Sequence, residues 1–170
     1  MTDPRVLFIH GLEGSPQGAK ARLFATHFES LTPAMDTSDF EACLEVQGRA
    51  IESFQPDVVV GSSFGGAVAV ALLASRAWRG PTLLLAQAAI HYDADASLPN
   101  DATVWLVHGS RDTLLPLEHS RRLAATGHPD RVRLIEVEDD HPLHASVETG
   151  ALLDWVRGLA RETTPSDGIS

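Results

Sequence analysis

Short apolar runs alternate with longer stretches of helical periodicity along this chain. Six runs predict strands, at residues 6–9, 33–35 (a weak one), 57–60, 82–86, 103–108 and 132–137. Five segments predict helices, at residues 18–29, 38–54, 64–76, 117–125 and 143–160. Strands that alternate with helices in this way are typical of a doubly wound α/β fold with a mostly parallel sheet.

The hydrophobicity of each run predicts its place in the sheet. The third, fourth and fifth runs are almost entirely apolar, as expected of central strands that helices cover on both faces. The sixth run alternates charged and apolar residues, which favours an edge strand. Ser38 and Glu41 have the spacing of a capping box for the second helix, and Pro116 suits the first turn of the fourth.

Composition indicates a single globular domain. The chain has 170 residues, of which 44% are hydrophobic and 21% charged. We expect one domain over residues 1–162 and a disordered polar tail over 163–170. No apolar run is long enough to span a membrane, and residues 1–4 lead into a strand without a secretory signal pattern. A cytoplasmic protein without a membrane partner is the expectation.

Charge and cysteine content argue against nucleic-acid binding and against disulfide or cysteine-rich zinc proteins. The formal net charge of −10 argues against nucleic acid as a partner, because phosphates would be repelled. Cys43 is the only cysteine, which excludes an internal disulfide and a cysteine-rich zinc site. Its place in a helical pattern favours burial over catalysis. No pattern in the sequence indicates an oligomeric state.

The stretch Gly61-Ser62-Ser63-Phe64-Gly65 matches the pattern G-x-S-x-G and follows an apolar run directly. In a nucleophile elbow, a strand ends in a tight turn that exposes the central serine above the sheet, and a helix begins at once. The pattern therefore predicts Ser63 as a nucleophile. Ser62 is the neighbour most easily confused with it, and a turn without chemistry is the alternative interpretation.

A serine nucleophile needs a base and an acid, and candidates follow the last two strands. Asp112 follows the fifth strand and His141 the sixth, so the chain order is Ser, Asp, His. The alternatives for the acid and the base are Asp93, Asp95, Asp139, Asp140 and His144. A metal site at Asp140, His141 and His144 is disfavoured, because Pro142 places His141 in the loop before the helix.

The turn after the first strand supplies a fourth candidate element. The backbone N–H groups of Leu12 and Phe64 are predicted to form an oxyanion hole, where charge would develop on a tetrahedral intermediate. His10 and His108 are interpreted as residues that fix their loops or pack beneath the site. All these elements follow the carboxyl ends of strands, where open parallel sheets bind ligands.

Two stretches carry a family resemblance: residues 10–21, with a His-Gly turn followed by Ser-Pro and a Lys-containing helix, and the elbow 61–66. With them the chain resembles the α/β-hydrolase superfamily, and within it a group of short, lidless bacterial esterase-like proteins. The resemblance implies a six-stranded sheet of order 2-1-3-4-5-6, no substantial cap domain, and a carboxylester or acyl thioester hydrolase without metal or organic cofactor. Where that group often has Asn-Pro after the fourth strand, this chain reads Gln87-Ala88-Ala89-Ile90.

The sequence therefore favours a serine esterase or thioesterase that acts on a small acyl substrate through an acyl-enzyme. Two alternatives stay open: a ligand-binding protein without activity on the same scaffold, and a peptidase or acyltransferase with the same triad. Residues 89–101 form the longest insertion, so an open site with at most a small lid is expected. The candidate substrate-lining residues are His10, Glu13, Ile90, His91, Tyr92 and Leu114.

Overall fold

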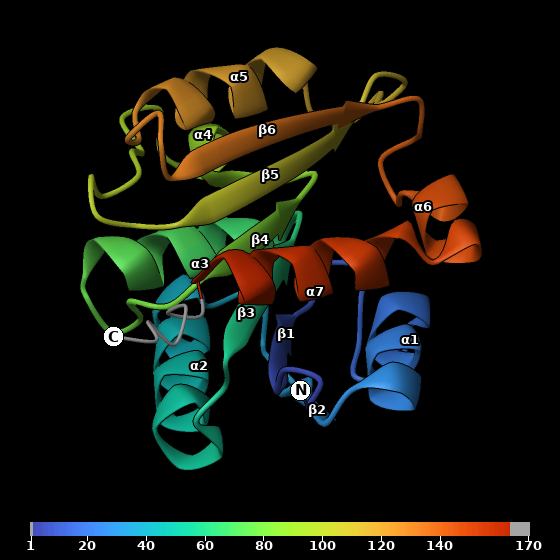
Figure 1. Ribbon diagram of the computed structural model, residues 1–170. Coiled ribbons are helices and arrows are strands. Elements are labelled where there is room, and N and C mark those ends of the chain that lie inside the picture. The colour runs from blue at the N-terminus through green and yellow to red at the C-terminus, as the bar shows by residue number, and fades with distance from the viewer. Residues whose placement is uncertain (1, 164–170) are drawn as a thin grey trace, which may run out of the picture.

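The computed structural model describes residues 2–163 and contains one six-stranded sheet between two layers of helices (Figure 1). Every neighbouring pair of strands is parallel, and the order is β2-β1-β3-β4-β5-β6, which confirms the expected order. The strands are β1 (Val6–Ile9), β2 (Ser30–Leu31), β3 (Val58–Ser62), β4 (Thr82–Leu85), β5 (Val104–Gly109) and β6 (Val132–Val137).

Helices cover both faces of the sheet, and each face has its own hydrophobic cluster. The helices are α1 (Ala19–His27), α2 (Phe40–Phe54), α3 (Phe64–Ala74), α4 (Ala89–Tyr92), α5 (Leu117–Ala125), α6 (His144–Thr149) and α7 (Ala151–Thr163). α2, α3, α4 and α5 pack on one face, while α1 and α7 pack on the other. The buried runs of β3, β4 and β5 are therefore central, as their apolar composition predicts.

The strand register brings the carboxyl ends of separate strands to one edge of the sheet. Ile9 at the end of β1 pairs with Gly61 near the end of β3. At the ends of β5 and β6, His108 pairs with Glu136 and Gly109 with Val137. The loops that follow these four strands therefore project from the same edge, which is where parallel sheets bind ligands.

The second strand differs from its prediction at residues 33–35. β2 consists of Ser30 and Leu31, which pair with Val6 and Leu7. The predicted segment was wrong because its apolar residues serve another purpose: Met35 packs against the core cluster beside α2. A two-residue edge strand has no hydrophobic pattern of its own to predict it.

The predicted helix over 143–160 is two helices. α6 ends at Thr149 and α7 begins at Ala151, because Gly150 between them has φ +77°, a left-handed conformation that glycine adopts without steric cost. α7 continues to Thr163, which was placed in the disordered tail. Residues 164–170 of that predicted tail lie outside the described residues.

Helix starts also differ from their predictions. Asp39, rather than Ser38, caps α2 by accepting a hydrogen bond from the Ala42 amide, and Ser38 bonds to Asp36 instead. Pro116 stands directly before α5 rather than in its first turn. The four-residue α4 was not predicted. Within residues 2–163, no helix is both long and apolar enough to cross a membrane.

Candidate active site

Ser63 lies on a strained turn between β3 and α3. Its φ is +54° and its ψ is −114°, a combination that a residue with a side chain rarely adopts. The turn is held by backbone hydrogen bonds to the neighbouring strand region: the Ser63 amide donates to the Leu85 carbonyl, and the Ser63 carbonyl accepts from the Ala88 amide. The surrounding sheet therefore maintains a conformation that directs the hydroxyl away from the core.

The glycines of the elbow allow α3 to approach the sheet closely. A Cβ atom at Gly65 would overlap the carbonyl oxygen of Ile9 on β1. A Cβ at Gly61 would lie 2.5 Å from the Gly65 carbonyl oxygen. Both positions therefore require glycine for steric reasons, which explains the glycine at each end of the pentapeptide.

Ser63, His141 and Asp112 form one chain of hydrogen bonds. The Oγ atom of Ser63 lies 3.0 Å from Nε2 of His141, and Nδ1 of His141 lies 2.7 Å from Oδ2 of Asp112. A carboxylate only accepts, so His141 carries its proton on Nδ1, and Nε2 is left to accept the serine proton. The three residues predicted at separate strand ends thus meet at hydrogen-bonding distances.

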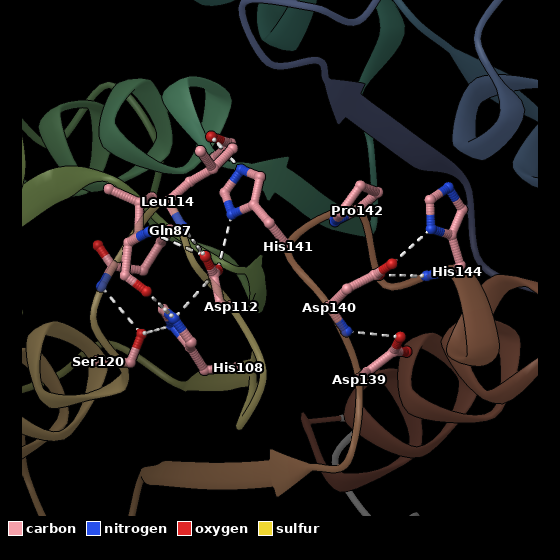
Figure 2. Close-up of polar contacts among 12 residues, drawn as sticks. Gln87, His108, Asp112, Leu114, Ser120, Asp139, Asp140, His141, Pro142 and His144 are labelled. Atoms are coloured by element: carbon pink, nitrogen blue, oxygen red, sulfur yellow. Dashed lines mark hydrogen bonds and ion pairs between the residues drawn. The ribbon is translucent and has the colours of Figure 1, made fainter.

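The Asp112 carboxylate is fixed by its own turn. Its Oδ1 accepts hydrogen bonds from the Leu114 and Leu115 amides at 2.9 and 2.8 Å, which leaves Oδ2 for His141. The Asp112 side chain has no exposed surface, whereas that of His141 is 15% exposed. Beneath the carboxylate, Nε2 of the buried His108 lies 3.3 Å from Oδ2. Figure 2 shows Asp112 between the two histidines.

The loop that carries His141 is anchored by its acidic neighbours. Asp139 is buried and accepts hydrogen bonds from the Ala145 and Ser146 amides and the Ser146 hydroxyl, so it caps α6. Asp140 pairs with His144, whose amide and Nδ1 both contact its carboxylate. Hydrogen bonding to the His144 amide lowers the pKa of Asp140 to about 2.

These contacts separate the alternative candidates from the site. Asp139, Asp140 and His144 contact one another and α6 (Figure 2). The hydrogen bonds of their side chains do not include the Ser63 hydroxyl, which contacts His141. Asp93 and Asp95 line a different cavity, described below. Within the described range, no group of three or more potential ligands could hold a metal ion.

Of the two amides predicted to form an oxyanion hole, that of Phe64 belongs to the elbow and that of Leu12 to the turn after β1. Gly11 packs against the elbow, because a Cβ there would lie 3.3 Å from Cβ of Ser63 and 3.9 Å from the Phe64 nitrogen. This contact brings the turn that contains Leu12 beside the nucleophile. Within residues 2–163, neither the Leu12 nor the Phe64 amide donates to another protein group, so both are free for a ligand oxygen.

A cleft of about 550 Å³ opens at Ser63 and His141. Of the candidate substrate-lining residues, it contains His10, Glu13 and Leu114. Its mouth carries two exposed leucines, Leu12 and Leu114, which are 53% and 71% exposed. The cleft therefore combines apolar side chains with polar ones, among them Glu13 and Lys20.

The other three substrate-lining candidates lie elsewhere. Ile90 is buried in the core, and His91 is exposed and packs edge-on against Tyr92. Tyr92 lines a second cavity of about 790 Å³ over α3, where its ring contacts those of Phe40 and Phe64. This cavity does not include Ser63.

Several contacts around the site were not predicted from the sequence. Lys20 donates a hydrogen bond to the Pro142 carbonyl, and Gln87 and Ser120 join His108 below Asp112. For Gln87 the sequence did contain a signal: this chain has Gln87-Ala88 where the resembled esterase-like proteins often have Asn-Pro. Nothing in the local pattern of Lys20 or Ser120 indicates a partner so distant in sequence.

No family model matches the sequence, and no curated protein matches it by sequence. Solved structures do match. Est1E of Butyrivibrio proteoclasticus superposes with a TM-score of 0.74 and 16% identity, covering 95% of this chain and 88% of its own. Mouse alpha/beta hydrolase domain-containing protein 10 gives 0.75 and 16%, with coverages of 95% and 91%. The chain has the α/β-hydrolase fold.

A third match among the solved structures is named as a lipase. The monoacylglycerol lipase of Paleococcus ferrophilus superposes with a TM-score of 0.69 and 14% identity, covering 93% of this chain and 96% of its own. At such identities the matches show the α/β-hydrolase fold alone. What the chain does therefore has to be argued from its own site.

Proposed function

We propose that the protein is a serine hydrolase that cleaves carboxylic esters or acyl thioesters through an acyl-enzyme on Ser63. The observation that carries the proposal is the hydrogen-bonded chain of Ser63, His141 and Asp112, with the serine on a strained turn. Nucleophile, base and orienting acid are the parts that acyl transfer by a serine requires. The fold agrees, because they occur in the order Ser, Asp, His that α/β-hydrolases use.

In the proposed reaction, Ser63 Oγ attacks the carbonyl carbon while His141 Nε2 takes the hydroxyl proton. The oxygen of the tetrahedral intermediate accepts hydrogen bonds from the Leu12 and Phe64 amides. His141 then protonates the leaving alcohol or thiol, and an acyl-Ser63 ester is left. A water molecule, deprotonated by His141, hydrolyses that ester and restores the serine.

Asp112 has an electrostatic part in each of these steps. Its carboxylate accepts the Nδ1–H of His141, so the imidazole keeps the tautomer that can accept the serine proton. The charge of the carboxylate also stabilises the imidazolium that forms when His141 is protonated. The reaction needs only side chains, backbone amides and water, and therefore no cofactor.

The form of the cleft and the structural matches favour ester substrates reached directly from solvent. The site opens at the edge of the sheet, and the described chain has no domain that covers it. Leu12 and Leu114 at the mouth suit an apolar acyl group or alcohol. The Paleococcus match is named as a lipase, an enzyme class that cleaves esters. We place the enzyme in the cytoplasm on the sequence pattern alone.

The test compares Ser63→Ala with Ser62→Ala on short-chain aryl esters and acyl-CoA thioesters of rising length. We expect Ser63→Ala to lower kcat by roughly 10⁴- to 10⁶-fold and to abolish labelling by a fluorophosphonate probe. Ser62→Ala, whose hydroxyl takes no part in the triad, should still label and hydrolyse. The chain-length series identifies the preferred acyl group and leaving group.

A folded wild-type protein that neither labels at Ser63 nor hydrolyses any member of the series would contradict the proposal. That result would favour a ligand-binding protein on a hydrolase scaffold.

A further inference from the structure

A row of buried polar side chains continues from Asp112 into the core. Nε2 of His108 lies 3.3 Å from Oδ2 of Asp112, and Nδ1 of His108 lies 2.7 Å from Oγ of Ser120. Ser120 Oγ in turn lies 3.0 Å from Nε2 of Gln87 (Figure 2). Gln87, His108 and Ser120 have no exposed surface, so solvent cannot substitute for any of these contacts. They come from three elements: Gln87 follows β4, His108 lies on β5 and Ser120 on α5.

The backbone at both ends of the row sets the direction of every hydrogen bond. At one end, Oε1 of Gln87 accepts from the Ala89 amide at 2.7 Å, so the Gln87 amide group donates to Ser120 Oγ. At the other end, His108 Nε2 lies 2.9 Å from the Leu115 carbonyl, which only accepts, so Nε2 carries a proton.

The middle of the row then has a single complete arrangement. The Ser120 oxygen accepts from Gln87, and its own hydrogen needs an acceptor. The unprotonated Nδ1 of a neutral His108 is that acceptor. A doubly protonated His108 would direct Nδ1–H at Ser120 and leave the serine hydrogen without a partner. Burial also lowers the pKa of His108, which favours the same neutral form.

His108 contacts Asp112 in two ways. Its Nε2–H donates to the Leu115 carbonyl, and the amide of the same Leu115 donates to Asp112 Oδ1 at 2.8 Å. The same N–H group lies next to Oδ2, the oxygen that faces His141. His108 therefore holds the turn that carries the carboxylate, and its ring lies against the carboxylate itself.

We propose that His108 is a positioning residue for the triad: the Leu115 carbonyl keeps a proton on its Nε2, Ser120 and Gln87 keep its Nδ1 unprotonated, and in this neutral form it orients Asp112 toward His141. The proposal rests on the proposed serine hydrolase function. It also explains why this chain has Gln87-Ala88 in place of the Asn-Pro pair of the resembled proteins. An Asn-Pro pair would not supply the Gln87 side chain that contacts Ser120 and the Ala89 amide.

The neutral form of His108 matters for the charge at the site. A neutral N–H that lies 3.3 Å from Oδ2 attracts the carboxylate through its dipole and adds no positive charge. The negative charge of Asp112 thus remains available to the imidazolium that His141 becomes during the reaction. A cationic His108 would compete with His141 for that charge and would weaken the base.

The kinetic test compares four variants with the wild type on one short-chain aryl ester, with active sites counted by fluorophosphonate titration. His108→Leu removes the N–H donor and should lower kcat by roughly 10- to 100-fold while KM stays within about twofold. His108→Gln places an N–H near the position of Nε2 and should recover part of that loss. Ser120→Ala removes the hydroxyl that donates to Nδ1, so His108 can gain a second proton, and kcat should fall by about tenfold. Ser53→Ala, a helix serine on α2 outside the row, is the matched control.

Nitrogen-15 NMR of the histidine rings gives a readout that does not depend on activity. At neutral pH the wild-type His108 should show a protonated Nε2 and an unprotonated Nδ1. Ser120→Ala removes the hydroxyl that donates to Nδ1, so its His108 should take up a second proton on Nδ1 at a higher pH than the wild type. An Nδ1–H tautomer or an imidazolium in the wild type would overturn the proposal. The proposal would also be overturned if the wild type is active and His108→Leu and Ser120→Ala have the same kcat per titrated active site as the wild type. A wild type that is inactive on every ester would instead refute the proposed function, and the NMR result would still decide the tautomer.

Discussion

The Lys20 ammonium donates a hydrogen bond of 2.7 Å to the carbonyl oxygen of Pro142, the residue that follows His141. Lys20 lies on α1 and also lines the cleft. Burial lowers its pKa, whereas the charges of Asp140 and Asp139 raise it. The contact joins the loop that carries His141 to α1, and both line the cleft.

Loss of the hydrogen bond from Lys20 to Pro142 should make the position of His141, the proposed base, less well defined. Lys20→Met keeps much of the apolar stem but loses the donor, and we expect kcat to fall on the order of tenfold while the protein stays folded. Arg22→Met removes an exposed cation from the same helix and is the control. Equal activities of the two variants in steady-state kinetics would show that the hydrogen bond from Lys20 to Pro142 does not contribute to catalysis.

Asp140 should make stability depend on pH in a narrow acidic window. Its pKa is about 2 in the folded protein against an ordinary value of 3.8, so the ionised form stabilises the fold. That stabilisation is complete well above pH 4 and is lost as the pH falls toward 2. Urea unfolding should therefore show Asp140→Asn less stable than wild type at pH 7, with the difference narrowing below pH 4. Asp154→Asn on α7 is the control, and a difference that stays constant down to pH 2 would contradict the assignment.

Gly65 should tolerate no side chain. In Gly65→Ala the new methyl group would overlap the Ile9 carbonyl on β1, so α3 would have to move away from the sheet. We expect little folded protein and no fluorophosphonate labelling. Gly48→Ala is the matched control: a Cβ there meets nothing within 4 Å, and helix propensity should stabilise α2 by about 0.5–1 kcal/mol. Circular dichroism and thermal melting measure both effects.

Gln47 on α2 is fully buried, and in the described structure neither its Oε1 nor its Nε2 has a hydrogen-bond partner. Burying an unpaired amide is costly, so Gln47→Leu should raise the free energy of unfolding by about 1–2 kcal/mol. Gln47→Glu should lower it, because a charge would be buried at the same place. Urea denaturation measures both, and a stabilised Gln47→Glu would indicate a polar partner for this side chain.

The sequence predicted the parts of the fold that depend on local pattern. β1, β6 and α5 have the predicted bounds, because β1 is a continuous apolar run and β6 and α5 mix apolar with polar residues in patterns of strand and helix length. The elbow and the acid and base that follow β5 and β6 were predicted because each one directly follows a strand, and the parallel sheet brings such positions to one edge. Their chemical roles remain proposals.

Other features depend on contacts between distant segments. β2 exists only because Ser30 and Leu31 pair with β1, and α4 begins where the Gln87 side chain accepts the Ala89 amide. The tautomer of His108 depends on side chains from β5, α5 and the loop after β4 that are adjacent only in the folded chain. No window of sequence contains these partners together, so no local pattern predicts them.

The register of β5 and β6 also has a consequence for the order of events in folding. Ser63 and His141 are 78 positions apart, and His141 reaches the serine only after β6 has joined the edge of the sheet. A partly folded chain with β1, β3 and β4 already paired would have the elbow but no base. Recovery of labelling during refolding should therefore lag behind recovery of helical circular dichroism. Labelling of Ser63 would then mark the moment at which β6, the last strand, pairs with β5.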